Sequence, residues 1–134
     1  MTIRVPRFAT CLLLAPLLLA PLVLASGAQA QINPYRGNRN APRLADSDVA
    51  LLGQAGQKLL GNPAPAKGAS ETWSNDATGA SGTVAFIGPS RRSAHGTSYA
   101  CRRLQYVVTL RNRPDPRTTR LDWCRLPDGT WKAI

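Results

Sequence analysis

The sequence is poor in the residue types that catalysis requires. It has one histidine, His95, and only seven acidic residues among its 134 positions. No acidic residue lies near His95 in the sequence to orient it as a general base. A nucleophile elbow, a phosphate-binding loop, a zinc-protease helix and a calcium-binding loop are all missing. We therefore predict a protein that is not an enzyme and that uses no cofactor.

Acidic residues are also missing from the first 30 positions, which have the three parts of a secretory signal peptide. Two arginines precede the apolar run CLLLAPLLLAPLVLA, and the small residues Ala28 and Ala30 follow it. The run is short for a bilayer, which needs roughly 20 apolar residues, and two prolines interrupt it. We interpret 1–30 as a signal peptide cleaved after Ala30, rather than as a membrane anchor.

Cysteine is scarce, and only Cys101 and Cys124 follow the predicted signal peptide. A small exported domain commonly needs a disulfide because its hydrophobic core is limited. Two thiols and one histidine are also too few ligands for a four-coordinate zinc site. We predict a Cys101–Cys124 disulfide and no metal.

The acidic residues are too few to balance 17 lysines and arginines. Removal of 1–30 takes away two arginines and no acid, so residues 31–134 have a formal net charge of +8. Clustered guanidinium groups suit phosphate or carboxylate ligands, whereas isolated ones on edge strands oppose aggregation. The candidates for binding an anionic ligand are Arg91, Arg92, Arg102, Arg103, Arg111, Arg113, Arg117 and Arg120.

A charge of this size favours association with lipid headgroups, lipopolysaccharide or an acidic polymer of the cell envelope. Improved solubility is the simpler alternative. Nucleic acid is a disfavoured partner because the protein is predicted to be exported.

Four segments follow the signal peptide. We predict a flexible basic lead at 31–44, a helix at 45–61, a linker at 62–70 and a sheet at 71–134. The helix has Val49, Leu52, Ala55 and Leu59 on one face. Because its two internal glycines weaken it, this helix needs something to pack against.

The strands of the sheet are predicted from short segments separated by turn residues. Segments 71–75 and 82–88 form a hairpin, and 89–98 is a polar loop that contains Arg91 and Arg92. Two longer strands, 99–112 and 118–126, flank a turn at 113–117, because proline cannot serve a central strand. A tight turn at 127–129 precedes a last short strand.

The disulfide and this turn predict different registers. If Cys101 lies directly opposite Cys124, the hairpin is centred between Asn112 and Arg113, whereas the prolines place the turn later. A bulge, or a disulfide between positions that are not opposite, would reconcile the two.

The longest predicted strand has one apolar face. Leu104, Tyr106, Val108 and Leu110 alternate on it, and Cys101 lies on the other face with most of the charge. The helix is the only evident cover for the apolar face. The predicted fold class is therefore α+β: one N-terminal helix packed on a small, mostly antiparallel sheet that one disulfide fastens.

The order of these motifs resembles the C-terminal domain of the bacterial 17 kDa surface-antigen family, over 45–134. The resemblance rests on DVALLGQAGQKLL, on ETWSNDATGASGTV, on YACRRLQYVVTL and on the closing WCRLPDGTW. The matching positions are Trp73, Asn75, Gly79, Gly82, Cys101, Arg102, Cys124, Arg125, Asp128, Gly129 and Trp131.

The resemblance implies an envelope protein of Gram-negative bacteria, at the outer membrane, with no catalytic activity. Many relatives are lipoproteins with a glycine-zipper segment. This chain differs, because it has no acylation cysteine after its apolar run and no such segment before residue 71. A soluble periplasmic or secreted form is therefore as consistent with the sequence as one anchored at the outer membrane.

Three hypotheses result. The first is a non-catalytic envelope domain that associates with an anionic envelope component through its arginines. The second is a small periplasmic inhibitor or protein-binding module. The third, an enzyme that uses His95, is the least favoured.

Overall fold

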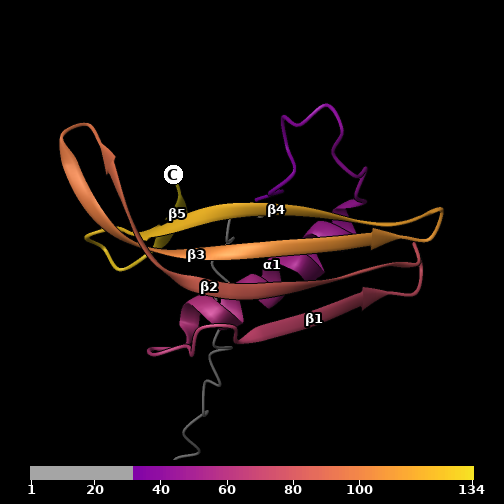
Figure 1. Cartoon of the computed structure of the whole chain (residues 1–134), viewed down its shortest axis with the longest axis horizontal. Helices are drawn as coiled ribbons and strands as arrows, with labels where there is room; N and C mark the ends of the chain where they lie inside the picture. The colour runs from indigo at the N-terminus through magenta and orange to yellow at the C-terminus, as the bar shows by residue number, and fades with distance from the viewer. Residues whose placement is uncertain (1–31) are drawn as a thin grey trace, which may run out of the picture.

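The structure is a computed structural model that describes residues 32–134 (Figure 1). The predicted signal peptide, 1–30, lies outside the described residues. One helix precedes five antiparallel strands, and each strand pairs with the next along the chain. The elements are α1 (Asp46–Gly61), β1 (Ser70–Asn75), β2 (Ala80–Ala94), β3 (Thr97–Leu110), β4 (Arg113–Arg125) and β5 (Trp131–Ala133).

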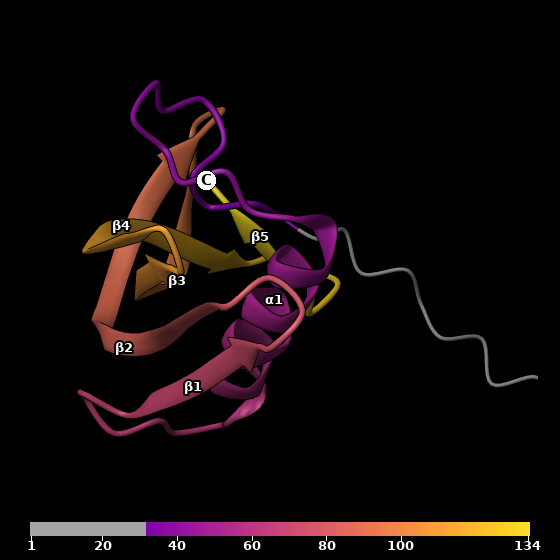
Figure 2. The same cartoon turned by 90° about the vertical axis from the view of Figure 1, so that its right-hand side faces the viewer.

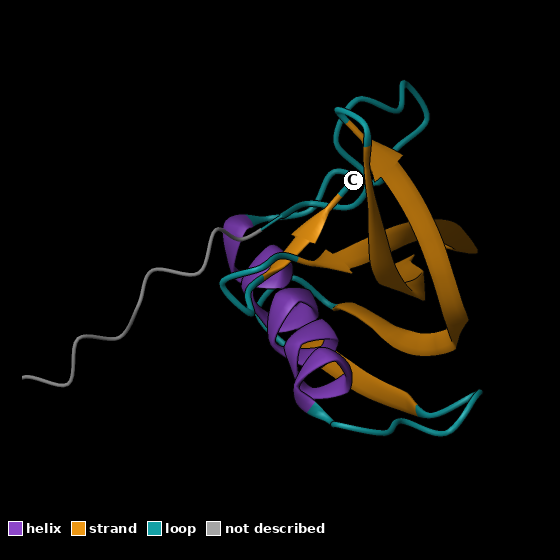
Figure 3. Ribbon diagram, turned by 90° about the vertical axis from the view of Figure 1, so that its left-hand side faces the viewer, coloured by secondary structure: helices purple, strands orange, loops and turns teal. Residues whose placement is uncertain are grey.

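The hydrophobic core lies between α1 and one face of the sheet (Figures 2 and 3). The predicted apolar stripe of the helix is buried, with Leu52 and Leu59 only 1% and 4% exposed. From the sheet, Leu104, Tyr106 and Val108 are buried against it. The predicted α+β fold is confirmed.

Helix α1 forms despite its internal glycines. One of them, Gly56, lies where the helix packs on the sheet. A Cβ atom at Gly56 would lie 3.4 Å from the hydroxyl oxygen of Tyr106. That hydroxyl accepts a hydrogen bond from the indole nitrogen of Trp123 at 2.7 Å. Glycine thus lets the helix approach a buried aromatic pair closely.

The segment 89–98 is not the predicted polar loop. Strand β2 continues to Ala94, a turn at His95 and Gly96 follows, and β3 starts at Thr97. This end of the β2–β3 hairpin bends out of the rest of the sheet (Figure 1). It looks like a loop in sequence because most of its side chains face solvent and need not be apolar.

A bulge lies between Phe86 and Gly88, where β2 changes its register against β3. An extra residue reverses which side chains face each side of the sheet. After the bulge, Ser90 pairs with Cys101 and Arg92 with Tyr99, so both lie on the face that carries the disulfide.

The turn between β3 and β4 is also not where the sequence predicted it. It lies at Arg111 and Asn112, and the proline-rich segment 113–117 is the start of β4. Cys101 lies directly opposite Cys124, and a register shift between Val108 and Leu110 absorbs the additional β4 residues. Direct opposition with a bulge is therefore the arrangement that occurs.

Tyr35 belongs to the segment that was predicted to be a flexible lead, but its side chain is buried. This residue is 3% exposed and belongs to the core. Its hydroxyl donates to the backbone oxygens of Tyr106 at 3.1 Å and Arg117 at 2.8 Å. The segment from 32 to 45 therefore runs alongside the β4 edge of the sheet (Figure 1).

Candidate functional site

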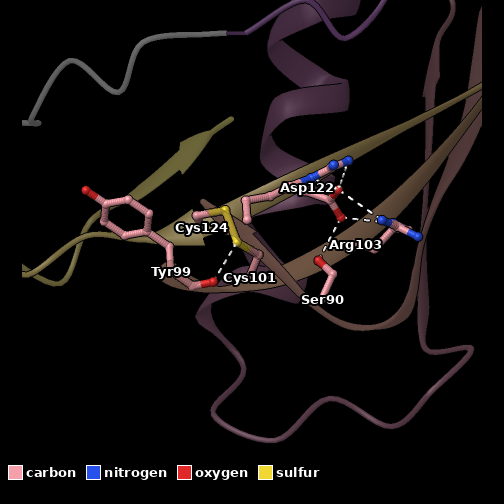
Figure 4. Close-up of a disulfide and its surroundings, with 7 residues drawn as sticks. Ser90, Tyr99, Cys101, Arg103, Asp122 and Cys124 are labelled. Atoms are coloured by element: carbon pink, nitrogen blue, oxygen red, sulfur yellow. Dashed lines mark hydrogen bonds and ion pairs between the residues drawn. A yellow bond between two sulfur atoms is a disulfide. The ribbon is translucent and has the colours of Figure 1, made fainter. Parts of the chain in front are cut away.

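The Cys101–Cys124 disulfide is present and joins β3 to β4 (Figure 4). Both cysteines are buried, at 4% and 0% exposure. Since the two residues are 23 positions apart, the bond closes a loop that contains most of the β3–β4 hairpin. It is a structural crosslink between the two strands.

Beside the disulfide, the Asp122 carboxylate forms ion pairs with Arg92 and Arg103, two of the predicted anion-binding arginines. Figure 4 shows Asp122 with Arg103 and the disulfide. Its carboxylate accepts hydrogen bonds from Arg103 Nε at 2.9 Å, Arg92 Nε at 2.6 Å and the Ser90 hydroxyl at 2.7 Å. The Asp122 side chain is 2% exposed, whereas both arginines are about half exposed, at 43% and 50%. Arg92 and Arg103 thus satisfy a buried acid.

The hydrogen bond from Arg103 is the main reason that the pKa of Asp122 falls from 3.8 to about 2. Burial opposes this change, and the bonds from Ser90 and Arg92 add to it. The same hydrogen bond raises the pKa of Arg103. Asp122 therefore stays ionised far below neutral pH.

Arg102 lies on the opposite face of β3 and holds the C-terminal end of α1. Its guanidinium donates to the backbone oxygens of Leu59, Leu60, Asn62 and Pro63, at 3.1, 2.9, 2.6 and 3.0 Å. These carbonyls have no partners within the helix, and a cation there also complements the helix dipole.

The Arg102 guanidinium also lies 4.9 Å from the ring centre of Trp131 in β5. Burial, followed by the nearby charge of Arg125, lowers the pKa of Arg102. One arginine of the resembling motif therefore joins three elements, and it does so without an external ligand.

The glycines of the resembling motif have packing roles. Gly82 lies opposite Trp73, where an added Cβ would come within 2.8 Å of the indole nitrogen. Gly79 closes the β1–β2 turn at a φ of 71°, which favours glycine.

Asn75 connects this turn to the helix. It donates to the Asp48 carboxylate at 2.6 Å, and Thr78 donates to the same oxygen at 2.7 Å. The other carboxylate oxygen accepts the backbone N–H of Ala45, before the first helical residue. Asp48 is thus buried, yet its hydrogen bonds are satisfied.

The closing motif is a tight turn. Asp128 accepts from the backbone N–H and the hydroxyl of Thr130, and the hydroxyl bond is the main cause that lowers the Asp128 pKa. Gly129 has a φ of 85°. The turn leads to Trp131, which pairs with Arg125 across β4 and β5. These residues build the turn that returns the chain to the sheet.

Five predicted arginines remain. Arg91 is exposed on β2, and its side chain makes no ion pair or hydrogen bond within residues 32–134. The other four divide into two groups. Arg120 donates to Gln105 at 2.9 Å, and Arg111 donates to the backbone oxygen of Asp76 at 3.3 Å. Within residues 32–134, Arg113 and Arg117 have no ion pair or side-chain hydrogen bond with the protein. These two arginines lie where β4 begins.

Arg113 and Arg117 line a cleft of about 380 Å³ between β3–β4 and the N-terminal segment. Arg39 and Arg43 of the N-terminal segment also line it, so four arginines border one space. We call this the arginine cleft; its other lining residues are Asn40, Ala41, Leu110 and Asn112. Of the residues that the structure describes, none with a carboxylate lines it.

The sequence predicted only half of the arginine cleft. Arg39 and Arg43 belong to the segment predicted to be flexible, which gave no reason to place them beside β4. The available signal was Tyr35, a large aromatic residue between polar neighbours, since such a residue often packs into a core.

His95 lies at the exposed tip of the β2–β3 hairpin, with a φ of 49°. Among residues 32–134 it has no acidic partner. The same part of the chain contains no group of His, Cys, Asp and Glu side chains placed to hold a metal ion. No helix in 32–134 has the length and apolar character needed to cross a membrane.

No protein-family model, curated protein or solved structure matches this chain. The resemblance to the 17 kDa surface-antigen family therefore stays a prediction.

Proposed function

We propose that this chain is an exported, non-catalytic domain of the Gram-negative cell envelope, of the 17 kDa surface-antigen type, located in the periplasm or at the outer membrane. In this proposal its arginines bind an anionic envelope component. The disulfide supports the exported location, because such bonds persist in oxidising compartments.

The observation that carries the binding function is the distribution of charge partners. The two buried acids, Asp48 and Asp122, already have hydrogen-bonding partners, and Glu71 pairs with Lys58 at 3.4 Å. Several arginines make no ion pair or side-chain hydrogen bond within residues 32–134, namely Arg36, Arg39, Arg43, Arg91, Arg113, Arg117 and Arg125. The positive charge is therefore available to a partner outside the protein.

The test is cosedimentation of the disulfide-bonded protein with isolated outer membranes and with peptidoglycan, over a range of salt concentrations. We expect pelleting at low salt that is lost as salt rises, since salt screens exposed charges. Vesicles of neutral phosphatidylcholine serve as the control. An absence of pelleting at low salt contradicts the proposal.

A second candidate is a periplasmic inhibitor or protein-binding module, and the edge of β2 favours it. Strand β1 pairs with β2 only as far as Ala85, so the stretch from Gly88 to Ala94 has no strand on that side among the described residues. An open edge can accept a strand from another protein. This candidate predicts one partner whose binding depends little on salt.

A further inference from the structure

We propose that the arginine cleft is a binding site for a phosphate monoester group. This inference rests on the proposed function and names the chemical class of its ligand. It goes beyond a general basic surface, because it assigns binding to one cleft and to four named side chains: Arg39, Arg43, Arg113 and Arg117.

The fold brings these four side chains together from two distant segments. Arg113 and Arg117 come from the start of β4, and Arg39 and Arg43 come from the segment that precedes α1. The Tyr35 hydroxyl bonds the backbone of Arg117 at 2.8 Å and thereby holds the two segments side by side. The site therefore exists only in the folded protein.

The lining favours a ligand with more than one negative charge. Four arginines line a space of about 380 Å³, and the lining has no carboxylate to offset their charge. A phosphate monoester has a charge of about −1.5 to −2 at neutral pH and three acceptor oxygens. A carboxylate has one charge and two oxygens, which a single arginine can satisfy.

The neutral lining residues are consistent with this ligand. The side-chain amides of Asn40 and Asn112 can donate further hydrogen bonds, and Leu110 and Ala41 add little polarity. Elsewhere, Arg92, Arg102 and Arg103 are occupied by Asp122 and by the end of α1. The arginine cleft is the place where several arginines converge without such partners.

The experiment compares two double variants of the full chain, expressed in a host that forms disulfides. The cleft variant is Arg43→Gln with Arg113→Gln. The control is Lys67→Gln with Lys132→Gln, which removes the same charge from exposed positions outside the cleft. Thermal unfolding of both variants establishes that they are folded.

Two probes separate the sources of a phosphate group. Inorganic phosphate, followed by calorimetry and by arginine side-chain NMR shifts, tests the free anion. Phosphatidylcholine vesicles that contain phosphatidic acid test a monoester on a lipid surface. Vesicles with phosphatidylglycerol, a diester, provide the comparison at matched surface charge.

We expect the wild-type protein to prefer phosphatidic acid over phosphatidylglycerol. The cleft variant should lose about tenfold or more in affinity for inorganic phosphate and for phosphatidic acid vesicles, because it removes charged hydrogen bonds, while the control should lose little. Binding of the phosphatidic acid vesicles without binding of inorganic phosphate would mean that the site recognises a monoester on a lipid. Binding of both probes would mean that the site recognises the phosphate group itself.

Equal losses in the cleft and control variants would overturn the inference and leave the proposed function standing as binding by general charge. Equal affinity for phosphatidic acid and phosphatidylglycerol would show that the ligand is not specifically a phosphate monoester. Tighter cleft-dependent binding of polygalacturonate, a polymer of carboxylates, would show the same. Failure of the proposed function looks different, because the wild-type protein would then not pellet with any envelope fraction.

Discussion

At the scale of single residues, Asp122 is a buried acid whose charge is balanced by two arginines. It is 2% exposed, and it is bound by Arg92, Arg103 and Ser90. A buried carboxylate is costly unless it is paired and hydrogen-bonded. Both conditions hold here, so the arginines around it are explained by folding.

We expect Asp122→Asn to lower the free energy of unfolding by about 2 kcal/mol at neutral pH, from the lowering of its pKa from 3.8 to about 2. A lowered pKa stabilises the folded state above 3.8, and this stabilisation is lost as pH falls toward 2. The difference between wild type and variant should therefore shrink over that interval.

Urea denaturation across that pH range measures the difference directly. Asp115→Asn is the control, because Asp115 is exposed and has no ion pair among the described residues. If the difference between wild type and Asp122→Asn stays constant down to pH 2, the ion cluster is not the cause.

Gly82 has no room for an added methyl group. A Cβ there would clash with the backbone oxygen of Val107 and would lie 2.8 Å from the Trp73 indole nitrogen. We expect Gly82→Ala to destabilise the protein by about 2 kcal/mol, as overpacking of a core does. Thermal unfolding and Trp fluorescence measure it.

The matched control for Gly82→Ala is Gly53→Ala, at a helix position where nothing lies within 4 Å of the new methyl group. Here we expect a gain of up to about 1 kcal/mol, because alanine favours the helix and restricts the unfolded chain. Equal effects at the two positions would mean that Trp73 does not pack on Gly82.

At the scale of elements, Arg102 connects α1 to β3 and β5. Lysine at this position keeps the charge but loses the planar fork that reaches several carbonyls at once. We expect Arg102→Lys to lower the free energy of unfolding by about 1–2 kcal/mol, through lost charged hydrogen bonds.

Amide hydrogen exchange locates this effect. The last turn of α1 and strand β5 should exchange faster in Arg102→Lys, whereas the β1–β2 hairpin should not change. Arg125→Lys is the control, since the Arg125 side chain is exposed and makes no hydrogen bond or ion pair with the described residues. Uniform faster exchange would show that Arg102 does not act at these two elements in particular.

The elements also show what the sequence can predict. The helix and the β1–β2 hairpin were predicted correctly, because their buried apolar residues recur at the spacing of a helix face or of a strand face. The continuation of β2 through Arg91 and Arg92 was missed, since side chains that face solvent carry no such period. The prolines at 114 and 116 were predicted to form a turn. They lie instead in a part of β4 whose outer side pairs with no strand of residues 32–134, where proline is tolerated.

The candidate site was less predictable than the fold for a related reason. The alternation along β3 and β4 shows which face an arginine occupies, but a cleft requires knowledge of what packs beside it. Arg39 and Arg43 reach the arginine cleft through the hydrogen bonds of Tyr35, which act across more than 70 positions of sequence. Sequence periodicity does not encode such a contact.

At the scale of the whole molecule, the disulfide supports the sheet where its pairing is shortest. Strand β5 has three residues and pairs only with Trp123, Cys124 and Arg125. The arrangement of β5, and thereby of Trp131 over Arg102, depends on the part of β4 that Cys124 fixes to β3.

We expect the double variant Cys101→Ala with Cys124→Ala to lose about 3 kcal/mol, the usual effect of opening a loop of this length. Dithiothreitol should lower the urea midpoint of the wild-type protein to nearly that of the variant, and should leave the variant unchanged. The variant then serves as its own control for effects of the reductant on the rest of the protein. A wild-type midpoint that does not respond to reductant would mean that the two thiols are not bridged in the protein as the cell makes it, and the proposed location in an oxidising compartment would lose its structural support.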